Sequence, residues 1–185
     1  MPYAKIKENM KTLRLILGDQ LNPCHSWFST IDPNVFYILL EIRQETDYVL
    51  HHAQKIIAIF AGMRDFAQQL QTAGHHVQYL GIQDTSDSPS LTTHLSQVIQ
   101  KNRFTHFEYQ EPDEWRLDDQ LEQFTQDLSI SSKMVSSEHF FTQRSTAQDF
   151  FGERKKWLME SFYRQMRQQH QILMAPDQKP IGGTW

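Results

Sequence analysis

The first residues that could do chemistry follow a short apolar run, Leu13 to Leu17. Next come Gly18, Asp19 and Gln20. A turn with a glycine exposes backbone N–H groups, Asp19 offers only acceptors, and the Gln20 amide both donates and accepts. These groups could hydrogen-bond a polar heterocycle or a ribityl chain, but simple turn chemistry explains them equally well. Neither GxGxxG nor GxxxxGK[ST] occurs, so no dinucleotide fingerprint or P-loop is indicated.

A second polar set follows the apolar run from Val35 to Leu40. Glu41 comes directly after this run, where a carboxylate is either exposed at the ligand edge of a sheet or buried with a partner. Glu45 and Tyr48 follow at the expected start of a helix. Structural roles compete here, because Glu45 suits a helix N-terminus electrostatically and Asp47 is a plausible helix cap.

Metal binding is not indicated by the histidines. His51 and His52 are adjacent, so on a helix they would point about 100° apart, whereas helical zinc ligands are spaced i, i+4. The pairs Cys24-His25 and His75-His76 offer nothing better. We therefore predict no metal site.

An acidic segment surrounds Trp115 and Arg116. Asp113 and Glu114 favour the N-terminus of the helix expected to follow, which explains much of the charge. Glu111 and Trp115 are left over, and they are candidates for a ligand edge or for docking another domain. Arg116 stands beside them.

The last expected helix, about residues 147–170, combines an apolar stripe with basic residues. Such a helix can contact nucleic acid, but a core stripe with a solvated basic face is the commoner interpretation. A third interpretation is that the helix docks to another domain, with Tyr163 and Arg167 taking part. The net charge of the chain, −4, also argues against binding nucleic acid through its phosphates, so any DNA contact is expected to be local or made elsewhere.

The chemistry-bearing residues sit on an alternating pattern of elements. Short apolar runs predict strands at 13–17, 35–40, 77–82, 104–109 and, more weakly, 133–135. Amphipathic stretches predict helices at about 48–72, 91–101, 115–128 and 147–170. The stripe of the first helix is formed by Ile56, Ile59, Phe60, Met63, Phe66, Ala67 and Leu70. Gly74 is its natural stop.

Right-handed crossovers between parallel strands place helices on both faces of a sheet. The predicted fold class is therefore α/β, a doubly wound, mainly parallel five-stranded sheet with helices on both faces. Ligands of such sheets bind outside the carboxyl ends of the strands, where the strand order reverses.

The composition describes an ordinary globular protein, with 39% hydrophobic and 22% charged residues. No run approaches about 18 apolar residues, so no membrane span is expected. The lone Cys24 agrees with a reduced, cytoplasmic compartment. We expect a flexible tail over 1–11, an α/β domain over 12–174, and the start of an interdomain linker over 175–185, where prolines and glycines follow the last helix.

Several of these motifs, in order, resemble the N-terminal domain of the deoxyribodipyrimidine photolyase-related proteins, the bacterial iron-sulfur cryptochromes and (6-4) photolyases. The resemblance covers essentially the whole chain from about Leu13. It is carried by LILGDQL, LLEIRQETDYVLHHAQKIIAIFAGMRDF, EPDEWR, ERKKWLMESFYRQMR and the C-terminal GG.W.

The resemblance implies a Rossmann-like antenna domain joined to a helical domain. In the family the helical domain holds FAD, an iron-sulfur cluster on four cysteines and the DNA lesion pocket. The antenna domain holds 6,7-dimethyl-8-ribityllumazine, which absorbs light and passes energy to the flavin. The residues that match the antenna pocket are Gly18, Asp19, Gln20, Leu40, Glu41, Ile42, Glu45, Tyr48 and Ile59. Polar contacts are implied for Asp19, Gln20, Glu41 and Glu45, and walls for Leu40, Tyr48 and Ile59.

One cysteine cannot supply four cluster ligands, and no residues remain for the helical flavin site. We therefore expect the chain not to repair DNA alone, and to contact DNA only through a full-length protein with a C-terminal helical domain. A fragment, a truncated product and a stand-alone module remain open. Two other functions also remain open: a small nucleotide- or flavin-binding enzyme, for which no nucleophile–base pair is visible, and an interaction module that docks through Trp115 and the last helix.

Overall fold

The computed structural model describes residues 10–183 and 185. The expected flexible tail over 1–11 lies almost wholly outside the described residues. Chain contacts define two compact units, Met1–Ser137 and Glu138–Trp185. We expected one domain over 12–174 with a linker after it; the division found here falls instead after Ser137, and the extent of the independently folding domain stays a prediction.

The first unit contains a sheet of five parallel strands, in the order β3-β2-β1-β4-β5. The strands are β1 (Thr12–Leu15), β2 (Val35–Leu40), β3 (His76–Leu80), β4 (His106–Gln110) and β5 (Ser131–Val135). The chain runs outward from β1 through β2 to β3, then returns to the other side of β1 for β4 and β5. The predicted doubly wound α/β fold is thereby confirmed, and the strand order reverses between β1 and β4.

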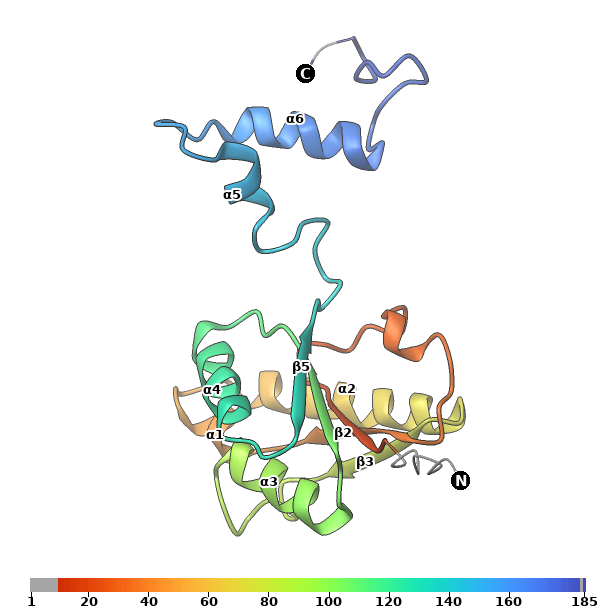
Figure 1. Ribbon diagram of the computed structural model, residues 1–185, viewed down its shortest axis with the longest axis vertical. Coiled ribbons are helices and arrows are strands. Elements are labelled where there is room, and N and C mark those ends of the chain that lie inside the picture. The colour runs from red at the N-terminus through yellow and green to blue at the C-terminus, as the bar shows by residue number, and fades with distance from the viewer. Residues whose placement is uncertain (1–9, 184) are drawn as a thin grey trace, which may run out of the picture. The chain divides into compact units, whose positions relative to one another are not determined.

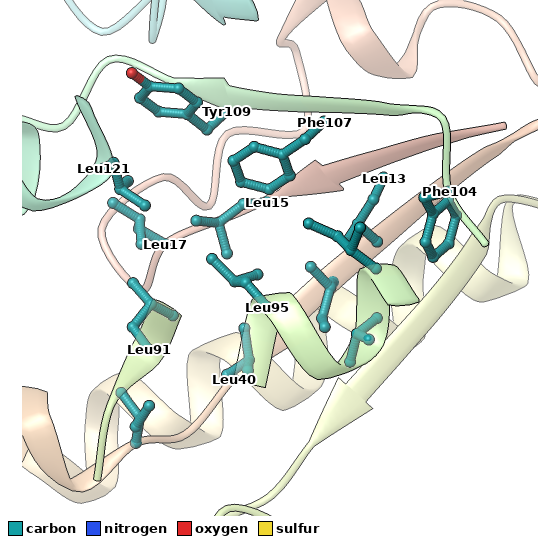
Figure 2. Close-up of a cluster of buried hydrophobic side chains, with 14 of the residues drawn as sticks. Leu13, Leu15, Leu17, Leu40, Leu91, Leu95, Phe104, Phe107, Tyr109 and Leu121 are labelled. Atoms are coloured by element: carbon teal, nitrogen blue, oxygen red, sulfur yellow. The ribbon is translucent and has the colours of Figure 1, made fainter. Parts of the chain in front are cut away.

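Helices cover both faces of this sheet (Figure 1). Helix α2 (Ala53–Thr72) packs on one face, and helices α3 (Leu91–Asn102) and α4 (Trp115–Gln126) pack on the other. Successive residues of a strand point to opposite faces. Leu15 of β1 therefore joins the core under α3 and α4, while its neighbour Ile16 joins the core under α2. Figure 2 shows the first of these cores, in which Leu95 and Phe107 are completely buried.

The helix predicted over 48–72 is present as α2 but begins five residues later, at Ala53, and a separate short helix that we did not predict precedes it. The short α1 (Arg43–Asp47) precedes α2, and residues 48–52 between them are not helical. Helix α2 begins after His52, whose ring accepts a hydrogen bond from the Gln54 N–H. The predicted stop is confirmed: Gly74 follows the helix with φ +99°, a conformation that favours glycine. The structure also adds a 3₁₀ turn, η1 (Ser26–Phe28), which we did not predict.

In the second unit, the prediction of a single helix over 147–170 is wrong. Helix α5 (Thr146–Phe151) ends at Gly152, which has φ +54° and ψ −132°, and α6 (Met159–His170) starts after an irregular segment. The Trp157 ring of that segment stacks on the buried Phe151 ring, with the centroids 4.8 Å apart. The apolar spacing of the sequence continues across Gly152 and therefore predicted one helix, although the backbone at Gly152 is not helical. None of the helices within the described residues is long and apolar enough to cross a membrane.

The core under α3 and α4 generates a test of the fold. Leu95→Ala removes a completely buried side chain between the sheet and α3, so it should lower the free energy of unfolding by about 2–5 kcal/mol. Gln97→Ala, at an exposed position of the same helix, should change it little. Urea unfolding followed by circular dichroism measures both. Equal effects of the two substitutions would contradict the placement of this core.

Candidate functional site

A cavity of about 210 Å³ lies at the carboxyl ends of β1 and β2. The turn after β1 contributes Gly18 and Asp19, and the segment after β2 contributes Glu45 and Tyr48. The start of α2 supplies an apolar wall, and the opposite side is closed by Leu91, Glu114 and Leu117. This edge is where ligands of doubly wound sheets bind.

Seven of the nine residues predicted for the pocket line this one cavity. They are Gly18, Asp19, Leu40, Ile42, Glu45, Tyr48 and Ile59. These positions span 42 residues of sequence, from 18 to 59, and the fold brings them together. Gln20 and Glu41 are not among the lining residues.

Gln20 has a structural role instead. Its side chain is buried, its Oε1 accepts from the Leu17 N–H at 3.1 Å, and its Nε2 donates to the Gln110 and Glu111 carbonyls at 3.3 and 3.2 Å. The amide thus ties the turn after β1 to the end of β4. Both polar atoms of this amide are hydrogen-bonded within the protein, and we expect no ligand contact from Gln20.

Glu41 forms an ion pair with Arg64, whose side chain is 61% exposed. Its carboxylate is completely buried and accepts from Arg64 Nε at 2.5 Å and Nη2 at 2.9 Å, from the Tyr79 hydroxyl at 2.5 Å, and from the Ile82 N–H at 3.0 Å. Burial alone would raise the pKa of Glu41, but these hydrogen bonds outweigh it and lower the pKa below its ordinary value. The carboxylate joins the end of β2 to α2 and β3, and it is not a lining residue of the cavity.

Gly18 lies close to two side chains of α2. A Cβ atom at this position would lie 3.1 Å from Ile59 Cγ2 and 3.1 Å from Met63 Sδ. A larger residue would therefore require the Ile59 and Met63 side chains to shift by a few tenths of an ångström. All three residues line the cavity, so a side chain at position 18 would alter its wall.

Arg116 lies at the edge of the cavity, bound to two of its lining residues. It donates to Glu45 Oε1 at 3.1 Å and Oε2 at 2.7 Å, and to Glu114 at 3.0 Å from both Nε and Nη2. Its guanidinium carbon lies 4.3 Å from the centre of the Tyr48 ring. The hydrogen bonds to Glu45, and then those to Glu114, raise the pKa of Arg116 above its ordinary value.

The other residues predicted for docking lie in different surroundings. Trp115 is 79% exposed, while the Glu111 backbone N–H donates to the Val135 carbonyl at 2.8 Å. In the second unit Tyr163 is exposed, but Arg167 is buried and donates to the Ile172 and Leu173 carbonyls beyond the end of α6. A docking role for these residues stays a prediction.

Sequence reasoning missed part of the lining. Ile56, Phe60 and Met63 belong to the same apolar stripe as Ile59, so the helical spacing could have identified them. Leu91 and Leu117 come from helices on the opposite face of the sheet, and no local pattern links them to β1 or β2. His51 lines the cavity and His52 caps α2, and no group of three or more potential metal ligands occurs among the residues described.

A doubly wound sheet with a cavity at its carboxyl edge is typical of α/β domains that bind small molecules. The sequence defines the family more narrowly: residues 14–185 match the model of the deoxyribodipyrimidine photo-lyase-related proteins, and the chain belongs to this family. It is also similar to a (6-4) photolyase from Agrobacterium fabrum (strain C58 / ATCC 33970), with 34% identity over 177 residues. That alignment covers 95% of this chain but 35% of the relative, so the chain spans about a third of the relative's length.

The Glu41 ion pair generates a prediction about pH. Because the folded-state pKa of Glu41 lies below its ordinary value of 4.5, the stabilisation is complete above that value and is lost as the pH falls through the folded-state pKa. Glu41→Gln should lower the free energy of unfolding at neutral pH by about 1–3 kcal/mol, since Arg64 and Tyr79 lose an ionised acceptor. Urea unfolding of both chains from pH 7 down to about pH 3 should show the difference shrinking. A difference that is constant over this range would contradict the assignment.

Proposed function

We propose that this chain is the light-harvesting domain of a larger photolyase-related protein, and that it binds 6,7-dimethyl-8-ribityllumazine in the cavity at the carboxyl ends of β1 and β2. The observation that carries the proposal is the convergence of seven predicted residues on one cavity. The chain's membership of the family supports it.

The shape and chemistry of the cavity fit one heterocyclic ring. Leu40 and Ile42 are buried apolar residues at its sheet side, and Ile59 and Met63 face it from α2. Its volume of about 210 Å³ is below the roughly 300–1,000 Å³ of sites for drug-sized ligands. A planar bicyclic ring would therefore enter, and a polyol chain would remain nearer the opening.

Polar side chains also line the cavity. Asp19 and Glu45 supply acceptors for hydroxyl or ring N–H donors, and Lys55 supplies a donor. When bound, the chromophore would supply absorption of blue light and transfer of the energy to a flavin. The rate of such transfer depends on the relative orientation of the two chromophores. The role of the protein is therefore to hold the ring in one orientation and to keep water from its faces.

A helical domain with FAD and an iron-sulfur cluster is the partner that this function requires. The length of the (6-4) photolyase relative, of which the chain spans 35%, supports a larger assembly. Exposed apolar side chains in the second unit support it too, among them Phe140, Phe141, Leu158 and Ile181. DNA binding and repair would belong to the complete protein.

The cavity assignment predicts the effect of filling one wall. Ile59→Trp should weaken binding of ribityllumazine by the 185-residue chain about tenfold or more, or roughly 1.4 kcal/mol, because the larger ring occupies the ligand's space. Ile57→Trp is the matched control, since Ile57 is an exposed residue of the same helix outside the lining. Fluorescence titration with the chromophore measures the affinities.

Two results would count against the proposal. Equal affinities of the Ile59→Trp and unchanged chains would reject this cavity as the binding site. Absence of any ribityllumazine binding by the folded, unchanged chain would reject the proposed function.

A further inference from the structure

We propose that the ion pair between Glu45 and Arg116 determines the size class of ligand at this site: it bridges the carboxyl edge of the sheet, so that a single heterocycle with a short polar chain is admitted and a dinucleotide is excluded. This inference deepens the proposed function and rests on it.

The position of the pair follows from the strand order. Glu45 lies in α1, beyond the carboxyl end of β2, and Arg116 lies in the first turn of α4, beyond the carboxyl end of β4. Strands β2 and β4 are the two neighbours of β1. The pair therefore connects segments on either side of β1, at the edge where the strand order reverses. Dinucleotides bound to doubly wound sheets lie across this crevice.

The geometry of the pair suits a rigid bridge. Both terminal nitrogens of Arg116 reach the two oxygens of Glu45, at 3.1 and 2.7 Å, which is the bidentate arrangement that a planar guanidinium favours. Glu114 accepts from the same side chain, and the Tyr48 ring lies beneath the guanidinium. Since Glu45, Tyr48 and Glu114 all line the cavity, Arg116 positions three of its walls.

A second link runs parallel to the ion pair. Gln44 Nε2 donates to Gln120 Oε1 at 2.5 Å, and Gln44 Oε1 accepts from Gln120 Nε2 and the Leu91 N–H, each at 3.1 Å. Helix α1 buries none of its side chains and has no side-chain cap at its N-terminus. Since no side chain within α1 is buried, these polar links to α4 and α3 help to hold the helix beside the cavity, together with the buried Ile42 that precedes it.

The charges of the lining also disfavour a dinucleotide. Asp19, Glu45 and Glu114 bring carboxylates to the cavity, balanced by Arg116 and Lys55. A pyrophosphate laid along this edge would meet the carboxylates and would have to break the bridge. An uncharged polyol can hydrogen-bond to the carboxylates with the bridge in place.

The test compares ribityllumazine with FAD on the 185-residue chain, by fluorescence titration and stopped-flow dissociation. We expect the unchanged chain to prefer ribityllumazine by about 100-fold or more, and Arg116→Ala to lose about tenfold or more of this preference while releasing ribityllumazine faster. Arg43→Ala is the control, because it removes an exposed α1 ion pair with Asp47 outside the cavity lining; it should leave the preference unchanged.

Two further variants separate positioning from folding. The double exchange Glu45→Arg with Arg116→Glu restores an ion pair across the edge, so it should show part of the preference that Arg116→Ala loses. Arg116→Lys keeps the charge without the planar guanidinium, so it should retain less of the preference than the double exchange. Thermal unfolding verifies that each variant is folded. If Arg116→Ala does not fold, Arg116→Lys decides, and an unaltered preference in it overturns the inference.

The outcomes distinguish this inference from the function on which it rests. Ribityllumazine binding with the same preference in Arg116→Ala as in the unchanged chain overturns the bridge and leaves the proposed function standing. Equal affinity of the unchanged chain for FAD and ribityllumazine would also overturn the bridge and leave the proposed function standing. If the unchanged chain binds no ribityllumazine, the proposed function fails and the bridge inference fails with it.

Discussion

A completely buried carboxylate must be paired, and the site depends on how the protein meets this constraint at Glu41. The side chain collects donors from α2, from β3 and from the backbone after β3. Those contacts fix the direction in which the chain leaves β2. The next residues form the floor and one side of the cavity, so a structural ion pair outside the lining decides where the lining residues lie.

The carboxyl ends of β1 and β4 are held together by a neutral side chain, the Gln20 amide. Gln20 spans the turn after β1 and the carbonyls at the end of β4. Parallel pairing of β1 with both neighbours brings their carboxyl ends to one edge, and Gln20 and Glu41 hold this edge on both sides of β1. In our proposal, the shape and charge of the lining residues then determine which molecule fits the cavity.

Much of the fold could be predicted from the sequence, because the central strand β1 and its neighbour β2 lie in short apolar runs and α2 carries a clear apolar stripe. Local patterns placed the start of α2 five residues too early, because the apolar stripe that defines this helix begins only at Ile56 and does not fix its first turn. They also did not show the break at Gly152, since apolar spacing continues across it. The site was predicted in outline. A polar residue after a buried strand has the same sequence signature whether it lines the cavity, as Asp19 does, or is buried away from the lining, as Gln20 and Glu41 are. Only the tertiary partners distinguish the two.

The central claim is that a ribityllumazine ring occupies the cavity between the ends of β1 and β2 and helix α2. A crystal structure of the 185-residue chain grown with ribityllumazine tests it most directly. The account predicts ring density between Leu40 and Ile59, with the polyol directed toward Asp19 or Glu45 and the Glu45–Arg116 pair intact. Density for the chromophore at another site, with this cavity filled only by water, would contradict it.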